Sequence, residues 1–341
     1  MVIPGSKRVT IDDIAELAGV HPSTVSRALR PGSTLIKSET ASRIRALADE
    51  HGYTPDRNAA SLRTQRTGTI GVVVPRLSDH LMALFYEAVA AKCHDRDYVA
   101  LVATTNDDPD GERRASEALL ARRVDGLVLT TARLNDSYLN ELESREVPFV
   151  LALRRDGNHP YAINDDVEGG RLAALHLIEL GHRRIGMVAG PEYATNALGR
   201  RQGFEQAHHE AGVTLYSELI HPSRFRWDDG FLFAKEMLRS KNPPSAIFAV
   251  NDEAALGVLA AAQSLDISVP EELSIVGYND LPSAARPPIP LTTVKINLAE
   301  VAKRSVSMTF ERIRRRRAKN WTGSVTLEVR ASSAPPKANL K

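Results

Sequence analysis

The chain has few of the features that mark secreted or membrane proteins. It contains a single cysteine, Cys93, in 341 residues. One cysteine excludes an intrachain disulfide and favours a reducing compartment, and the helical pattern around it predicts a small core residue rather than a reactive thiol. No apolar run reaches the length of a membrane span, and the first residues lack the apolar segment of a signal peptide. We therefore predict a cytoplasmic protein with no membrane partner.

The sequence also lacks the motifs of common enzymes and metal sites. No GxSxG, HExxH, P-loop or CxxC pattern occurs, and the histidines lack the spacing of metal ligands. We therefore predict neither an enzyme nor a bound cofactor or metal. A strong charge imbalance is missing as well: the net charge is +2, and residues 1–67 carry ten Lys and Arg against seven Asp and Glu. A mildly basic head on a neutral body suits DNA binding, although this asymmetry is weak evidence by itself.

What the N-terminal segment does contain is helical periodicity. Thr10 suits an N-cap, and apolar residues follow at i, i+3, i+4 spacing up to Gly19, which suits a tight turn. A second helix follows with Pro22 at its first position, and a third runs from about Ser38 to His51. Two short helices joined through glycine and buried by a third predict a helix-turn-helix, whose second helix enters the major groove. A three-helix bundle with a solvated polar face is the alternative.

A specific motif favours the DNA-binding interpretation. The segment from Val9 to Leu29, VTIDDIAELAGVHPSTVSRAL, resembles the head of the lactose-repressor (LacI/GalR) family. The resemblance implies a DNA-binding domain over residues 1–55, in which short hydroxyl side chains reach phosphates and an arginine pairs with a base. At His21 the family more often has serine, and the imidazole would contact phosphate or face water. The predicted contacts are Thr10, His21, Pro22, Ser23, Thr24, Ser26 and Arg27.

Residues 56–67 are predicted to form a hinge helix and linker. Pro55 disfavours helix at the residue before it, so a boundary falls there. The following helical segment is too short to be stable alone in water, and we expect it to form when two copies pair on DNA. The family resemblance implies that Leu62 enters the minor groove and kinks a base step, with Arg63 behind it. The predicted hinge contacts are Arg57, Asn58, Leu62 and Arg63; a plain linker is the alternative.

The body, residues 68–333, alternates apolar strands with amphipathic helices. Continuous Val, Ile and Leu strands between helices predict parallel sheets covered on both faces. Two such series predict an α/β core of two doubly wound parallel-sheet lobes, residues 68–165 plus 297–320 and residues 166–294 plus 325–331. Ligands in such folds bind beyond the carboxyl ends of the strands, here in the cleft between the lobes. The predicted strands are 69–74, 99–103, 124–129, 149–153, 184–189, 246–250 and 273–278. The predicted helices are 81–93, 110–122, 136–145, 169–180, 197–211, 229–240 and 252–265.

Two segments near the C-terminus have a distinctive composition, a basic run and a polar tail. The run 314–317, with Lys319, is predicted to end a helix as a solvated basic face, with accessory nucleic-acid contact as the alternative. The last ten residues are rich in Pro, Ser and Lys, which predicts a frayed tail that includes residues 334–341.

The family resemblance continues through the body in segments such as DVEGGRLA at 166–173, LGHRRI at 180–185 and GYND at 277–280. It implies a core similar to periplasmic sugar-binding proteins and a small-molecule effector. Arg200 would hold ligand hydroxyls or carboxylates, Phe225 would stack on the ligand, and Asn251 would hydrogen-bond it. Asn279 falls where the family usually has aspartate, which puts an ordinary monosaccharide in doubt. Loop position adds Ser78, Asp79 and His80 at the cleft mouth, with Ser78 and His80 as the predicted contacts.

Each of these residues also has a structural interpretation. Arg200 fits a surface salt bridge, Asn251 a helix cap, Phe225 lobe core and Asn279 a turn. Taken together, the sequence predicts a repressor whose affinity for double-stranded operator DNA is controlled by an effector. Because one head covers one half-site, a near-palindromic operator requires a homodimer.

Overall fold

The computed structural model describes residues 9–29, 36–53 and 66–337. The chain divides into two compact units, residues 1–67 and 68–341, and each is described by itself. The predicted hinge contacts Arg57, Asn58, Leu62 and Arg63 lie outside the described residues, so they stay predictions.

The first unit contains the three expected helices, α1 (Ile11–Ala18), α2 (Pro22–Ala28) and α3 (Ser38–Glu50). Each helix contributes one fully buried side chain to a shared core: Ile14, Val25 and Ile44. Gly19 ends α1 with a φ of 60°, the left-handed conformation that glycine adopts without steric cost. The helical periodicity and the glycine turn of the sequence are therefore both confirmed.

The second unit contains two six-stranded sheets, one per lobe. The first sheet has the order β11-β5-β4-β3-β1-β2 and is parallel throughout. Its strands are β1 (Thr69–Val74), β2 (Val99–Thr104), β3 (Gly126–Leu129), β4 (Phe149–Ala152), β5 (Tyr161–Asn164) and β11 (Trp321–Gly323). The second has the order β12-β10-β9-β8-β6-β7, with β12 antiparallel to β10. Its strands are β6 (Ile185–Ala189), β7 (Ile220–Pro222), β8 (Ala246–Ala249), β9 (Ser274–Asn279), β10 (Thr292–Lys295) and β12 (Thr326–Glu328). The predicted doubly wound α/β architecture is confirmed.

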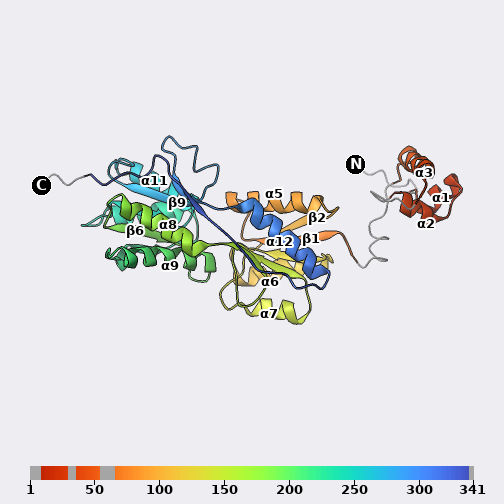
Figure 1. Ribbon diagram of the computed structural model, residues 1–341, viewed down its shortest axis with the longest axis horizontal. Coiled ribbons are helices and arrows are strands. Elements are labelled where there is room, and N and C mark those ends of the chain that lie inside the picture. The colour runs from red at the N-terminus through yellow and green to blue at the C-terminus, as the bar shows by residue number, and fades with distance from the viewer. Residues whose placement is uncertain (1–8, 30–35, 54–65, 338–341) are drawn as a thin grey trace. The chain divides into compact units, whose positions relative to one another are not determined.

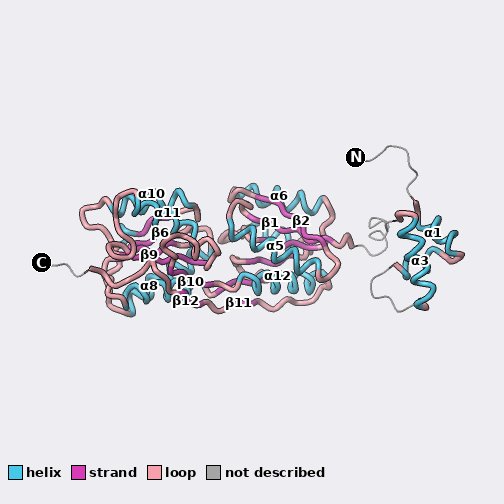
Figure 2. Tube along the Cα trace, turned by 90° about the horizontal axis from the view of Figure 1, so that it is seen from above, coloured by secondary structure: helices cyan, strands magenta, loops and turns pink. Residues whose placement is uncertain are grey.

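Helices cover both faces of each sheet. On the first sheet, α5 (His80–His94) and α12 (Leu298–Ile313) cover one face, and α6 (Pro109–Ala121) and α7 (Ser137–Ser144) cover the other (Figure 1). On the second, α8 (Asp166–Glu179) and α9 (Thr195–Glu210) cover one face, and α10 (Trp227–Leu238) and α11 (Asp252–Gln263) cover the other; Figure 2 shows α8 on the opposite side from α10 and α11. A short 3₁₀ helix, η1 (Ser217–Leu219), precedes β7. Alternation along β1 explains the layering, because Val72 joins the cluster of α5 whereas Val73 joins that of α6 and α7.

The chain passes between the lobes three times, after β5, after β10 and after β11. These crossings are the covalent links across the cleft, and they place α12 on the first lobe although it follows most of the second in sequence. No helix in the described ranges is both long and apolar enough to cross a membrane.

The short strands were not predicted. β5, β7, β10, β11 and β12 contain three or four residues each, which is too short to show a strand period in the sequence. Three of them, β7, β11 and β12, are edge strands that pair with one neighbour only.

The prediction of a frayed C-terminal tail is wrong at its start. The backbone N–H of Ile275 donates to the Ser332 carbonyl oxygen at 2.7 Å, and the Ser332 side chain is fully buried. Ala334 accepts from the Ser274 hydroxyl at 2.9 Å, and its carbonyl oxygen lies 3.0 Å from His182 Nε2. The polar composition that suggested fraying instead supplies hydroxyls and backbone groups that pair beside the amino end of β9.

Candidate functional site

The outward face of α2 begins with a helix cap that the sequence analysis missed. His21 is the N-cap, and its Nδ1 accepts a hydrogen bond from the Ser23 N–H at 3.2 Å and lies 2.8 Å from Ser23 Oγ. The ring thus performs the role that a serine side chain performs at this position. Thr10 caps α1 in a reciprocal pair with Asp13, whose N–H donates to Thr10 Oγ1 at 3.3 Å. Both predicted contact residues therefore hold helix ends as well.

Two arginines of α3 satisfy the carboxyl ends of the other helices. Arg43 Nη2 donates to the Ala18 carbonyl oxygen at 2.7 Å, and Arg45 Nε donates to that of Ala28 at 3.1 Å. These contacts satisfy carbonyl groups that have no partner inside their own helix. The exposed Arg27 side chain, in contrast, makes no hydrogen bond or ion pair within the described part of the chain. Ser23 is exposed beside it, and Pro22, Thr24 and Ser26 are half-buried.

In the second unit, a cleft lies between the carboxyl ends of the two sheets. Four of the six predicted effector residues line it: Arg200, Phe225, Asn251 and Asn279. The other lining residues are Pro75, Arg76, Asp79, Leu81, Met82, Asp107, Thr130, Leu153, Arg154 and Asn196. The lining therefore comes from both lobes, at the sheet edge where ligands bind in this class of fold.

Of the three loop residues expected at the cleft mouth, Asp79 lines the cleft, whereas the predicted contacts Ser78 and His80 do not. Asp79 is the N-cap of α5, and its Oδ1 accepts from the Leu81 N–H at 3.0 Å. Capping turns the Asp79 carboxylate inward, while Ser78 stays exposed. Burial raises the pKa of Asp79, and the Arg76 guanidinium opposes that shift.

Arg200 belongs to a buried network and is not a surface salt-bridge residue. Its Nε donates to Asp166 Oδ1 at 2.9 Å and its Nη1 donates to the Val250 carbonyl oxygen at 2.7 Å. The guanidinium carbon lies 3.7 Å from the ring centre of Tyr278, whose hydroxyl also donates to Asp166. The network orients the guanidinium, and its Nη2 has no hydrogen bond to any described residue.

Asn251 performs the capping role that was the alternative at its position. Its Oδ1 accepts from the Ala254 N–H at 2.9 Å, at the start of α11, and its Nδ2 donates to the Phe225 carbonyl oxygen at 3.1 Å. Asn251 thus positions the loop that carries Phe225 and keeps little hydrogen-bonding capacity for a ligand.

Four lining residues of the cleft have left-handed backbone conformations. The φ angles are 60° at Asp107, 64° at Leu153, 63° at Phe225 and 113° at Asn279. This region is costly for residues with a Cβ, by about 1–2 kcal/mol each. Such strain gathers at ligand sites, where the surrounding structure holds it. Its presence at four lining residues is consistent with a ligand site in the cleft.

Charged side chains from the first lobe form a cluster that the sequence analysis missed. Arg76 Nη1 donates to Asp107 Oδ2 at 2.8 Å, and Arg154 Nη2 lies 3.7 Å from the other oxygen, Oδ1. Arg76, Asp107 and Arg154 come from the loops after β1, β2 and β4. Their position just beyond predicted buried strands was the available signal, because such loops meet at one edge of a parallel sheet.

Contacts between the lobes hold the cleft narrow. The Arg133 guanidinium carbon lies 3.5 Å from the ring centre of Tyr193, and the Leu134 N–H donates to the Tyr193 carbonyl oxygen at 2.9 Å. Thr195 Oγ1 accepts from the Arg155 N–H and donates to the Arg155 carbonyl oxygen, both at 3.0 Å. The cavity that remains measures about 30 Å³, roughly the share of one water molecule in the liquid. A larger ligand therefore requires the lobes to part or the side chains to move.

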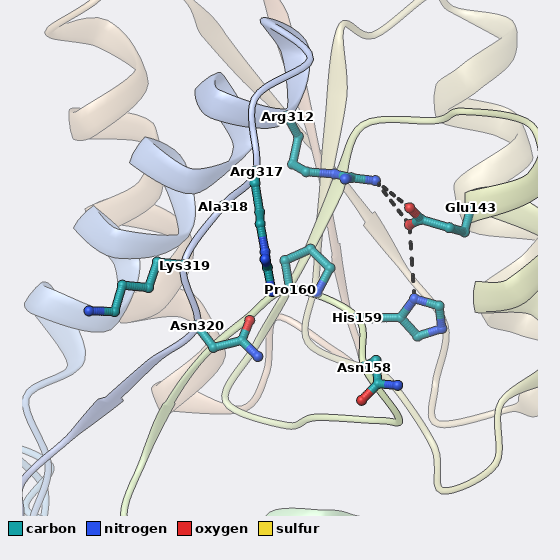
Figure 3. A pocket seen from close by; sticks show the side chains of 9 residues that line it. All are labelled: Glu143, Asn158, His159, Pro160, Arg312, Arg317, Ala318, Lys319 and Asn320. Atoms are coloured by element: carbon teal, nitrogen blue, oxygen red, sulfur yellow. Dashed lines mark hydrogen bonds and ion pairs between the residues drawn. The ribbon is translucent and has the colours of Figure 1, made fainter.

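A wider cavity of about 720 Å³ lies at the opposite, amino end of the first sheet (Figure 3). It is lined by Glu143, Asn158, His159, Pro160, Arg312, Arg317, Ala318, Lys319 and Asn320. Arg312 donates to both Glu143 oxygens, at 2.8 and 2.9 Å, and His159 Nδ1 lies 4.0 Å from Oε2. The neighbouring run 314–317 is exposed and directly follows α12, as predicted for a solvated basic face. Glu143, Arg312 and His159 interact with one another there, and none of the predicted effector residues lines this cavity, so it is a weaker candidate for a ligand site than the cleft.

Comparisons with known proteins match both units. Residues 10–56 match the family described as bacterial regulatory proteins, lacI family, and residues 174–333 match a periplasmic binding protein-like domain. The transcriptional repressor PurR of Haemophilus influenzae (strain PittEE) is 30% identical over 306 residues, covering 89% of this chain and 91% of PurR. The transcriptional regulator DegA of Bacillus subtilis (strain 168) is 33% identical over 299 residues, covering 86% and 88%.

Solved structures are similar over nearly the whole chain. The lac repressor dimer bound to operator and the anti-inducer ONPF has a TM-score of 0.85 and 26% identity, covering 96% of this chain and all of that one. The complex of the transcriptional regulator CelR with cellobiose has a TM-score of 0.71 and 28% identity, covering 95% and 100%.

Proposed function

The chain belongs to the LacI family of bacterial regulatory proteins, and we propose that it represses transcription from a near-palindromic operator under the control of a small molecule bound in the cleft. One observation carries the proposal. A helix-turn-helix whose Arg27 side chain pairs with no residue in the described ranges, and a two-lobed cleft with strained lining residues, occur in a single chain.

We infer that the protein acts as a homodimer. A single helix-turn-helix reads one half-site, and two-fold related heads match two half-sites. The lac repressor structure similar to this chain is a dimer on its operator. The hinge contacts Arg57, Asn58, Leu62 and Arg63 belong to the same proposal.

Effector binding would act through the lobes. The first lobe is joined to the head through Gly68, while the second lobe carries Arg200 and Phe225. A ligand that changes how the lobes meet would alter the geometry of paired hinges, and a coupling of about 1–3 kcal/mol is enough for a useful switch. PurR and DegA are regulators rather than enzymes, and the proposal includes no catalytic step.

The proposal is tested with full-length protein and a duplex selected by that protein from random DNA. Binding is measured by fluorescence anisotropy at fixed salt, because phosphate contacts make affinity salt-dependent. Arg27→Ala should weaken binding about 5- to 150-fold, the range of one base contact. The control is Arg239→Ala, which removes the same charge from the end of α10 and should leave binding unchanged.

Two further variants separate DNA binding from effector control. Leu62→Ala should weaken binding to the selected duplex and leave small-molecule binding intact. Arg200→Ala should abolish the response to a small-molecule extract and keep the affinity for DNA measured without it. Failure of the wild type to prefer any duplex would contradict the proposal.

A further inference from the structure

Arg154 is a buried guanidinium with few partners. Its side chain is 6% exposed, and it lines the cleft just after β4. Within the described residues it makes one long hydrogen bond, from Nη1 to the Thr131 carbonyl oxygen at 3.4 Å. A guanidinium has five N–H donors, and buried polar groups nearly always find partners. Most of the donors of Arg154 are therefore unused inside the cleft.

The nearby carboxylates do not use these donors. Asp107 Oδ2 accepts from Arg76, and Asp107 Oδ1, 3.7 Å from Arg154 Nη2, is buried without a hydrogen bond. Glu112 is the next acid, and burial raises its pKa to about 7, so that it carries only part of a charge near neutral pH. Arg154 and Arg76 thus share the Asp107 carboxylate, while Arg76 also has Asp79 at 3.7 Å.

The opposite wall supplies an acceptor without adding charge. Asn279 Oδ1 is buried and has no hydrogen-bond partner among the described residues. An amide does not repel an anion, unlike an aspartate at the same place. The apolar side chains of Leu153 and Phe225 also line the cleft, and the Arg154 guanidinium carbon is 5.7 Å from the Phe225 ring centre.

We propose that the cleft binds a small hydroxylated carboxylic acid, such as a sugar acid, with its carboxylate on Arg154. A guanidinium matches the two oxygens of a carboxylate and is the usual residue for such recognition. Hydroxyl groups supply the donors that Asn279 Oδ1 and Asp107 Oδ1 need. A phosphate would place an acceptor-only dianion beside Asp107 and is less suited. This inference rests on the proposed function, because it concerns the ligand of the same cleft.

The test is calorimetric titration of full-length protein with matched acids and neutral sugars. The probes are gluconate and galacturonate, compared with glucose and galactose, and glucose 6-phosphate is included to distinguish phosphate from carboxylate. We expect an acid to bind about 10- to 100-fold more tightly than its neutral counterpart, the range of hydrogen bonds to a charged group. Arg154→Met should remove this preference and leave any neutral-sugar binding within about threefold.

Controls distinguish a lost contact from a lost fold. Thermal unfolding of Arg154→Met should be unchanged or shifted upward, because replacing an underpaired buried ion with an apolar residue is often neutral or stabilising. Arg154→Lys keeps the positive charge but loses the two parallel N–H donors of the guanidinium, and it should retain a reduced preference for the acid. Arg122→Met removes an arginine at the end of α6 that does not line the cleft and should keep the full preference.

Several results would overturn the inference. Neutral sugars that bind as tightly as the acids, a preference retained in Arg154→Met, tighter binding of glucose 6-phosphate, or no binding by any probe would each contradict it. Failure of the proposed function is seen separately, because binding to the selected duplex is measured on the same samples.

Discussion

Individual side chains at helix starts perform two tasks in the head. Thr10 and His21 lie on the predicted DNA-binding surface, and each also accepts a hydrogen bond from the first turn of a helix. In His21 the acceptor is Nδ1, so the ring is held by the helix it caps. A substitution there changes the helix and the surface together, and the two effects have to be separated by the choice of replacement.

His21→Ala should destabilise α2 by about 1 kcal/mol, the usual cost of a lost N-cap, and weaken binding to the selected duplex. His21→Ser restores a short acceptor at the cap and should regain most of the stability. Amide hydrogen exchange of residues 23–28 reports the helix, and anisotropy reports DNA binding. Equal protection in His21→Ala and the wild type would show that the cap does not stabilise α2.

Glu112 predicts a dependence of stability on pH. Burial raises its pKa from an ordinary 4.5 to about 7, so the folded state holds the proton more tightly than the unfolded state. The free energy of unfolding should therefore fall as pH rises from about 4.5 to 7. Glu112→Gln stays neutral and should be more stable than the wild type above pH 7, by up to about 3 kcal/mol, with the difference vanishing near pH 4.5.

Denaturant unfolding at pH 5 and pH 8 measures this effect. Asp252, whose pKa burial also raises to about 7, is unchanged in the variant and contributes equally to both proteins. Glu117→Gln on the same helix is the matched control, because hydrogen bonding to Arg145 lowers the pKa of Glu117. Its substitution should give no gain at pH 8. A Glu112→Gln variant less stable than the wild type at pH 8 would contradict the interpretation.

At the scale of elements, the helix pairs of the second lobe pack through glycines. A Cβ at Gly203 on α9 would lie 1.8 Å from the Val167 carbonyl oxygen on α8, and one at Gly170 would lie 1.9 Å from the Arg200 carbonyl oxygen. This close approach brings Arg200 and Asp166, from neighbouring helices, within hydrogen-bonding distance. The glycines therefore help to build the network beneath the cleft.

Gly203→Ala should destabilise the protein although alanine favours a helix by about 1 kcal/mol over glycine. Overpacking against backbone costs about 1–3 kcal/mol, so we expect a lower melting temperature and a weaker response to the effector. Gln202→Ala changes the adjacent exposed position of α9 and should be close to neutral. A higher melting temperature for Gly203→Ala would show that the helices can separate freely.

At the scale of the whole core, Tyr193 and Thr195 join the two lobes. Both belong to the second lobe and contact residues 133–134 and 155 of the first. Arg76 Nη2 also donates across the lobes, to the Arg224 carbonyl oxygen at 3.4 Å, so polar and cation–π interactions contribute to the closed arrangement of the lobes. Cation–π interactions of this kind contribute about 0.5–2 kcal/mol each.

Tyr193→Ala should shift the lobes toward a more open arrangement. Small-angle scattering of the compact unit 68–341 should show a larger radius of gyration than the wild type, and effector binding should weaken about 2- to 30-fold. Tyr216→Ala is the control, since Tyr216 contacts Arg184 within the second lobe. An unchanged radius together with unchanged effector affinity would contradict a closing role for Tyr193.

The sequence predicted four residues that line the cleft, but it did not predict the charged residues that lie beside them. Arg200, Phe225, Asn251 and Asn279 were placed in the cleft by position, and all four line it. Ser78, Asp79 and His80 were placed at the cleft mouth by loop position alone, and of these only Asp79, the N-cap of α5, lines the cleft. The charged cluster of Arg76, Asp107 and Arg154 was missed, because three separate loops bring it together.

The sequence by itself determined the local structure: the cap at Thr10, the turn at Gly19, the helix start at Pro22 and the alternation of strands with helices. These depend on a residue's own conformational preferences and on neighbours within a turn or two. Only the tertiary structure decided that Arg154 is buried with few partners and that Ser332 packs beside β9. The burial of a side chain and its pairing with distant groups depend on segments far apart in the chain, so the periodicity of the sequence does not predict them.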